Sequence, residues 1–417
     1  MEVQQKEIER SIKLWPLMYT VSCDLIFFWV INVTFLTLVK GLSYAEFFAL
    51  DVIGSGVSLV LSYPLLLLIS KIGNNLSFKI GSLCLIVCVV LYIFGDDFIW
   101  FVIANCIYFI SHQFFVVTPN ILNNNLGLVG RKNEFIKYSA RGRLGYSILT
   151  LVITLIAGML FDVNAYIPMY LCLLFTILSL IISFFVHDQS KIKYQVYKPV
   201  KRLEITEKKP KSAVEKNSAY LLISLLLFII IFKGCLYIGS QYTKISLQEI
   251  GTAITIISVV LFIARGGRVI VNLFAEKMIK KHEKALMFVL PGILVMSFLL
   301  MSLPIILFES FILQFIFVSL GVILVTSFPD LYVLYYQHII VTSYKKEKHL
   351  KIFWIIEFFK TAGLFICNLI ITLLSLKFNP EITLVILTIF LSTIFVASAL
   401  IKRFWREEKL ETNQSVD

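Results

Sequence analysis

Ionisable side chains inside long apolar segments are the residues of this chain that could do chemistry. Asp24, His112 and Lys233 each stand within such a segment, and Gln113 follows His112 directly. Charged groups are costly in hydrocarbon, so those found there usually belong to proton, ion or substrate pathways. A carboxylate or an imidazole can take up and release a proton, and an amide can hydrogen-bond a solute. We therefore take these four residues as the candidate site for coupling protons to a substrate.

The segments that carry these residues have the composition of membrane-spanning helices. Of the 417 residues, 59% are hydrophobic and 15% are charged, whereas about 25% are charged in soluble domains. A helix needs about twenty apolar residues to cross roughly 30 Å of hydrocarbon. We predict twelve helices, at residues 15–39, 44–69, 78–94, 98–122, 139–160, 166–186, 218–238, 247–271, 285–303, 311–335, 353–376 and 382–404.

A basic, polar stretch divides these helices into two sets of six. We predict an N-terminal bundle over residues 1–186, a linker over 187–217, a C-terminal bundle over 218–404 and a tail over 405–417. The segment GYSILTLVITL from Gly145 matches GLFICNLIITL from Gly363, and TPN at 118–120 matches FPD at 328–330. The predicted fold class is an all-α membrane protein built from two pseudo-symmetric six-helix bundles.

The distribution of basic residues predicts the orientation of the chain. The net charge of +12 comes from Lys and Arg in short runs between apolar segments, which argues against nucleic-acid binding. With the N-terminus inside, the external loops carry only Lys40, Lys244 and Lys377, as the positive-inside rule requires. We expect a multi-pass protein of the cell membrane with both termini cytoplasmic, and the richness in Ile, Lys, Phe and Asn favours a bacterial source.

The motifs of common enzymes are missing from the sequence. It contains no Gly-rich phosphate loop, no paired catalytic carboxylates and no metal-ligand cluster. Its seven cysteines all fall inside apolar runs and are predicted to be free, buried thiols. We therefore expect no enzymatic activity, no metal and no cofactor. Energy for transport must then come from an ion gradient or from the gradient of the substrate.

The chain resembles the major facilitator superfamily of transporters over nearly its whole length. The resemblance rests on the twelve helices, the basic linker and the turns after the second and eighth helices, which read SKIGNN at 70–75 and EKMIKK at 276–281. The family places an acid and basic residues in the first turn and a looser copy in the second. Here the second turn keeps its acid, Glu276, whereas the first has lost its Asp. Within the family the chain resembles drug- and macrolide-efflux proteins, although the arginine in the fourth helix and the Gly-Pro in the fifth are absent.

The resemblance implies a gate on the cytoplasmic side. In the family, the acid of the turn is thought to dock on the start of a helix in the opposite half, where the helix dipole favours a negative charge. We expect Glu276 to contact Arg141 or Arg143, and Lys71 to face Glu357 with reversed polarity. The alternative is that the arginines only mark the membrane edge and touch lipid headgroups.

The resemblance also implies a central cavity lined by the first and fourth helices. Asp24 lies about 14 Å and His112 about 15 Å from the inner edge, so the two can face each other. The alternative for each is a permanently paired packing residue. Lys233 either influences the electrostatics of the outer cavity or snorkels outward along its aliphatic stem. Arg265 is expected at the headgroups. Asp330, near the inner end of its helix, is interpreted as a capping or gating residue.

Aromatic residues on the cavity helices predict a mostly apolar wall. The candidates are Phe27, Phe28, Trp29, Phe114, Phe115, Tyr332, Tyr335 and Tyr336. This wall favours a secondary transporter that exports small lipophilic compounds in exchange for protons by alternating access. The alternative is an uptake symporter or facilitator for a sugar, a nucleoside or a peptide fragment. A scaffold or sensor without flux is disfavoured. The expected partners are a small-molecule substrate, protons and the lipid bilayer, and the protein is expected to be a monomer.

Overall fold

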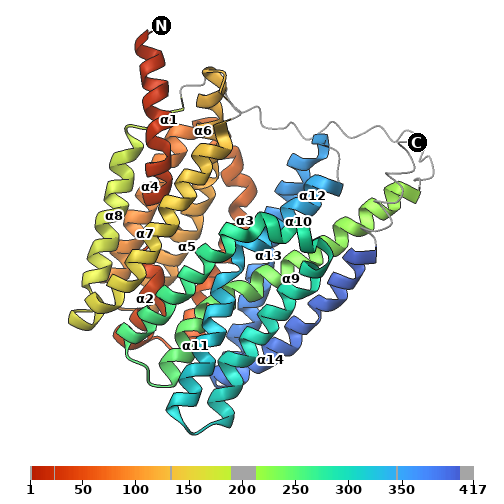
Figure 1. Cartoon of the computed structure of the whole chain (residues 1–417). Helices are drawn as coiled ribbons and strands as arrows, with labels where there is room; N and C mark the ends of the chain where they lie inside the picture. Colours follow the sequence, from red (N-terminus) through yellow and green to blue (C-terminus); the bar gives the residue numbers. More distant parts are fainter. Residues whose placement is uncertain (1, 23, 132–133, 189–212, 344–345, 404–417) are drawn as a thin grey trace. The chain divides into compact units, whose positions relative to one another are not determined.

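The computed structural model describes residues 2–22, 24–131, 134–188, 213–343 and 346–403, and nearly all of these residues are helical (Figure 1). These ranges contain no strand. Ten of their helices are long and apolar enough to cross a membrane, by length and composition alone. Two shorter apolar segments, Phe28–Val39 and Ile167–Ser183, fall at the positions of the remaining two predicted helices. The predicted fold class is confirmed.

The chain divides into two compact units. Unit 1 comprises Met1–Leu42 and Ile53–Arg202, and unit 2 comprises Ser43–Val52 and Leu203–Asp417. The helix that begins at Tyr44 therefore contributes its first residues to unit 2 and the rest to unit 1.

Unit 1 is an assembly of helices in which α1 and α4 make most of the packing contacts. Its elements are α1 (Glu2–Ser22), α2 (Phe28–Thr34), η1 (Phe35–Val39), most of α3 (Tyr44–Ile72), α4 (Asn74–Phe94), α5 (Phe98–Phe114), η2 (Phe115–Val117), α6 (Thr118–Leu128), α7 (Phe135–Val163) and α8 (Ile167–Ser183). α4 packs against α5 and α8, and α1 packs against α6, α7 and α8.

The first predicted helix, residues 15–39, is broken in the structure. α1 begins earlier than predicted, at Glu2, and ends at Ser22, and α2 starts only at Phe28. Between them, a carboxylate oxygen of Asp24 accepts a hydrogen bond from the backbone N–H of Leu25 at 2.9 Å. Such a local side-chain bond competes with the helical bonding of the backbone. The prediction of one continuous helix here was wrong, and Asp24 lies in the break.

Unit 2 contains the helices after the linker. They are α9 (Ala213–Glu249), α10 (Ile254–Leu307), α11 (Phe311–Ser327), α12 (Pro329–Ser343), α13 (Lys346–Ser375) and α14 (Pro380–Ser392). The backbone of α10 leaves helical geometry at His282, so this element holds two of the candidate spans, Ile254–Ala275 and Ala285–Leu307. α9 packs mainly against α13, and α10 against α11 and α14.

The glycines of the two matched segments lie at close helix contacts in both units. A Cβ atom at Gly145 of α7 would overlap the Thr20 hydroxyl of α1, and one at Gly363 of α13 would lie 2.5 Å from the backbone oxygen of Ile230 on α9. Small residues let helices in membranes approach closely. The matched segments therefore share a packing role, in which the fifth predicted helix of each half meets the first.

The end of α9 differs from the prediction. Lys244 was placed in an external loop, but α9 continues to Glu249 and the Lys244 residue is only 6% exposed. Its ammonium group donates to the Gln241 side chain at 3.2 Å, and Thr243 and Ser246 are buried beside it. The polar composition of this stretch suggested a loop, whereas the structure buries these side chains in unit 2.

Candidate functional site

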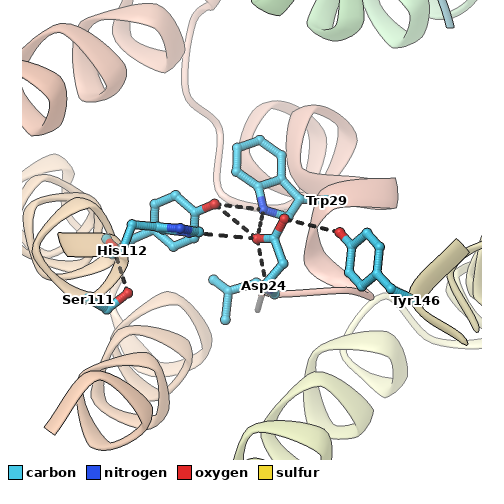
Figure 2. A network of polar contacts seen from close by, with 7 residues as sticks. Asp24, Trp29, Ser111, His112 and Tyr146 are labelled. Atoms are coloured by element: carbon cyan, nitrogen blue, oxygen red, sulfur yellow. Dashed lines mark hydrogen bonds and ion pairs between the residues drawn. The ribbon is translucent and has the colours of Figure 1, made fainter. Parts of the chain in front are cut away.

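Asp24 is the centre of a polar network in unit 1 (Figure 2). Its Oδ1 accepts hydrogen bonds from the Leu25 backbone N–H and the Tyr108 hydroxyl, both at 2.9 Å, and from the Trp29 indole N–H. Its Oδ2 accepts a longer bond of 3.4 Å from the Tyr146 hydroxyl. The donors come from the helix break and from α2, α5 and α7, so the tertiary fold of unit 1 assembles them.

The network is built where a helix is interrupted, between the end of α1 and the start of α2. The Asp24 side chain is 23% exposed, so it is neither sealed in the core nor free in solvent. Interrupted helices at the middle of a membrane form the substrate and ion sites of many secondary transporters, because their free backbone groups line a cavity. Asp24 therefore occupies a position suited to reversible binding.

His112 lies beside Asp24, as the sequence predicted. Its Nε2 atom is 4.0 Å from Asp24 Oδ1, and its ring packs edge-on against Tyr108 with centroids 4.5 Å apart. Nε2 is buried and makes no hydrogen bond to another described residue. A separation of 4.0 Å exceeds a direct hydrogen bond, but a small shift of either side chain would close it. The two side chains therefore lie at the limit of an ion-pair distance.

Gln113 and Lys233 do not take part in the bonds described for Asp24. The Gln113 amide donates to the Ser58 hydroxyl of α3 at 2.8 Å. Lys233 lies on α9 in unit 2, where it is half-buried. Their roles in proton or substrate coupling stay predictions.

Three donors of the Asp24 network were not singled out as hydrogen-bonding groups. Trp29 was considered only as part of an apolar wall, and Tyr108 and Tyr146 were not considered. Tyr108 precedes His112 by four residues, which places both on one face of a helix. That spacing was the available signal for Tyr108, whereas nothing local distinguishes Tyr146.

Most of the predicted aromatic wall is packed inside the units. Phe27 and Phe28 are each 4% exposed; Phe27 packs edge-on against Phe175, and Phe28 stacks on Tyr92. The remaining members other than Trp29 are also buried, namely Phe114, Phe115, Tyr332, Tyr335 and Tyr336. Of the groups around Asp24, Trp29 and Tyr146 are half-buried, whereas Tyr108 is buried like these rings.

The predicted gate is only partly described. Lys71, Arg141 and Arg143 are exposed, and the Arg141 guanidinium lies 5.7 Å from the centre of the Tyr138 ring. The side chains of Glu276 and Glu357 lie outside the described part of the chain. The pairings of these two acids therefore stay predictions.

Asp330 forms a second carboxylate centre, within unit 2. It lies in the first turn of α12 and receives two hydrogen bonds from the Arg268 guanidinium, at 2.7 and 2.6 Å. The Asn272 amide donates a third at 2.6 Å. Arg268 and Asn272 were not predicted as partners, although their spacing of four residues puts them on one face of α10. Arg265, expected at the headgroups, lies near the middle of the Ile254–Ala275 span.

Asp51 is a buried acid that the sequence analysis missed. It lies in the part of α3 that belongs to unit 2 and is 6% exposed. The Tyr237 hydroxyl of α9 donates to its Oδ2 at 2.9 Å, and Lys244 interacts electrostatically with it. The signal was the same as for Asp24, namely an acid within an apolar run. Unit 2 thus holds a further cluster of buried polar groups.

Comparison with known proteins identifies the class of the fold. No family model and no curated protein matches the chain. Among solved structures, a mutant of the nucleoside transporter NupG has a TM-score of 0.76 at 9% identity, covering 94% of this chain and 99% of that chain. Another structure of NupG has a TM-score of 0.69 at 10% identity, covering 96% and 99%.

A bacterial homologue of the human lysosomal transporter Spinster, in an inward-facing and occupied conformation, shares the fold more distantly. Its TM-score is 0.55 at 11% identity, covering 95% of this chain and 96% of that chain. The fold is therefore that of the major facilitator transporters. All three neighbours are transporters rather than enzymes, in agreement with the prediction that the chain is not an enzyme.

Proposed function

We propose that the protein is a proton-coupled secondary transporter in which Asp24 carries the coupling proton. The observation that supports this most directly is the position of Asp24 in a helix break, where it accepts four hydrogen bonds and lies 4.0 Å from His112. An ionised carboxylate only accepts hydrogen bonds, whereas a protonated one also donates. A proton on Oδ2 therefore requires the Tyr146 bond to reverse, and a proton on Oδ1 displaces the bonds of Tyr108 and Trp29 instead.

The transport step follows from this rearrangement. Tyr108 and Tyr146 can turn their hydroxyls from donating to accepting, because a hydroxyl does both. A proton that moves from His112 Nε2 to Asp24 leaves the imidazole neutral and the carboxyl group protonated. The two residues together thus shift the proton without creating an isolated charge within the membrane. The hydrogen bonds around the protonated Asp24 then present different groups to the substrate.

The proposed substrate is a small ring compound that forms hydrogen bonds, and a nucleoside is the first to test. The half-buried rings of Trp29 and His112 can face the plane of a base, and the carboxylate of Asp24 can accept from hydroxyl groups. NupG, which shares the fold, is a nucleoside transporter. Uptake driven by the proton gradient is the proposed direction.

Export of lipophilic compounds is the second candidate. The apolar character of the spans first favoured it, but Phe27, Phe28, Phe114 and Phe115 are buried in packing contacts. For either direction we place both termini in the cytoplasm and the protein in the cell membrane, from the bias of Lys and Arg. The predicted gate between Glu276 and Arg141 or Arg143 would close the cytoplasmic side.

Proteoliposomes containing the purified protein test this proposal. An inward proton gradient should drive accumulation of labelled uridine or adenosine, and uridine addition should move protons. Asp24→Asn should abolish gradient-driven accumulation but retain exchange of labelled for unlabelled substrate, because exchange needs no net proton movement. His112→Gln should slow proton-driven uptake on the order of tenfold, equivalent to about 1.4 kcal/mol in the barrier.

The matched control is Asp97→Asn, the same chemical change on an exposed acid at the start of α5. It should leave uptake unchanged. Full proton-driven accumulation by the Asp24→Asn protein would refute the coupling role. Proton movement triggered by lipophilic cations but by no nucleoside would instead favour export.

A further inference from the structure

Four asparagine side chains hold the chain where it leaves the last helix of unit 1. Asn74 and Asn75 begin α4, and Asn124 and Asn125 lie near the end of α6. The segment that they bind is His187–Asp188, a few residues beyond α8. Neither asparagine pair has a part in the Asp24 network.

The Asp188 residue is bound through its side chain and its backbone. Its Oδ2 accepts from the Asn74 amide at 2.6 Å and from the Asn124 amide at 2.8 Å. The backbone N–H of Asp188 donates to Asn75 Oδ1 at 2.6 Å, and its carbonyl accepts from Asn75 Nδ2 at 3.1 Å. Asn75 therefore pairs with this backbone as a neighbouring β-strand would.

The preceding residue is bound as well. The carbonyl of His187 accepts from the Asn125 amide at 2.7 Å, and its N–H donates to the Ser11 hydroxyl of α1 at 3.2 Å. Asn125 is 1% exposed and Val186, just before the segment, is 3% exposed. Six hydrogen bonds thus join α1, α4 and α6 to two residues that belong to no helix.

The turns after the second and eighth predicted helices differ in whether they carry an acid. The turn after the eighth predicted helix carries Glu276, whereas the turn at 70–75 carries two asparagines and no acid. Amide N–H groups that lie side by side at a buried position attract a carboxylate, and hydrogen bonds to a charged acceptor are stronger than neutral ones. Asp188, 114 residues away from Asn74 in the sequence, is the acid that the Asn74 and Asn124 amides bind.

We propose that Asp188 is a positioning residue for transport, which fixes the start of α4 and the end of α6, together with Ser11 of α1, to residues 187–188. The proposal rests on the proposed function. Since every partner belongs to unit 1, the contact moves with that unit and stays closed during transport. Its loss should allow these helix ends to move separately, which slows turnover without altering the Asp24 site.

Transport kinetics of Asp188 variants provide the first test. Asp188→Ala should lower Vmax for proton-driven uptake on the order of tenfold, the effect of losing a hydrogen bond to a charged group, and should leave KM unchanged. Asn74→Asp combined with Asp188→Asn exchanges acid and amide, so it should restore Vmax. Asp97→Asn is again the control that should change nothing.

Thiol labelling provides a second test that needs no substrate. Val186→Cys should react slowly with a membrane-permeant maleimide when Asp188 is present, and faster when Asp188→Ala is added. Unchanged labelling would overturn the proposed contact. Faster labelling with unchanged Vmax would overturn its role in transport while the proposed function stands.

The exchanged pair decides between positioning and general folding damage. Failure of the exchange to restore Vmax, in a protein with normal labelling, would also overturn the positioning role. If the unsubstituted protein transported none of the tested solutes, the proposed function and the transport role of Asp188 would both fail. Labelling of Val186→Cys would still test the contact independently.

Discussion

Asp24 in unit 1 and Asp330 in unit 2 are both part-buried acids at interruptions between helices, but their partners differ in kind. Asp24 accepts from an indole, two phenol hydroxyls and a backbone amide, all of them uncharged. Asp330 receives two bonds from the guanidinium of Arg268, which is always charged. The Asp330 carboxylate thus faces a fixed positive charge, whereas the Asp24 carboxylate faces uncharged donors and a histidine.

This difference separates a network of uncharged donors from a fixed ion pair. The Arg268–Asp330 pair links α10 to α12 with the geometry of a bidentate ion pair, which adds directional as well as electrostatic stabilisation. The Asp24 network offers several alternative bond patterns, because its hydroxyl groups donate or accept. Identical residue types thus serve different purposes because the surrounding helices supply different donors.

The largest effect on stability is expected at Asp330. Asp330→Asn leaves the guanidinium of Arg268 without its charged partner and should lower the free energy of unfolding by about 2–3 kcal/mol. Asp24→Asn should cost less than about 1 kcal/mol, because the new amide oxygen still accepts and the hydroxyl groups can reorient. Thermal unfolding in detergent, followed by tryptophan fluorescence, measures both. Equal losses in the two variants would contradict the distinction between a fixed pair and an exchangeable network.

A smaller effect should separate the matched glycines of the two units. Gly363→Ala places a methyl group against the Ile230 backbone, which cannot rotate away, and should cost about 1–3 kcal/mol. Gly145→Ala meets the Thr20 side chain, which can rotate, so its cost should be lower. Gly292→Ala, which meets no atom within 4 Å, is the control. Unfolding temperatures in the reverse order would contradict this distinction between a backbone contact and a side-chain contact.

The smallest effect should come from a part-exposed ion pair outside the membrane spans. Hydrogen bonds from the Arg131 guanidinium lower the pKa of Glu134 below its ordinary value of 4.5. The stabilisation by this pair is therefore present above pH 4.5 and is lost as the pH falls through the lowered pKa. Glu134→Gln should remove that part of the pH dependence and change the unfolding temperature at neutral pH by little. A pH titration of the unfolding temperature that is identical in both proteins would refute the contribution.

The sequence was informative about single residues and poor at predicting their neighbours. Asp24, His112 and Asp330 were selected because ionisable groups are costly within apolar segments, and the structure places the first two 4.0 Å apart. Asp51 gave the same signal and was overlooked. The break at Asp24 contains neither glycine nor proline, so no local breaker marked it. Lys244 was misplaced because a polar helix end and a loop have the same composition.

What the sequence by itself determined is the class of the protein. Runs of about twenty apolar residues can only be accommodated as helices in a membrane, because every backbone polar group must be bonded within the segment. Only the tertiary structure decided what surrounds each polar side chain. Tyr108 and Tyr146 reach Asp24 from α5 and α7, and Asn74 and Asn124 reach Asp188 from α4 and α6. Such contacts depend on how the helices pack, and helix packing is set by many weak interactions along each helix rather than by a local motif.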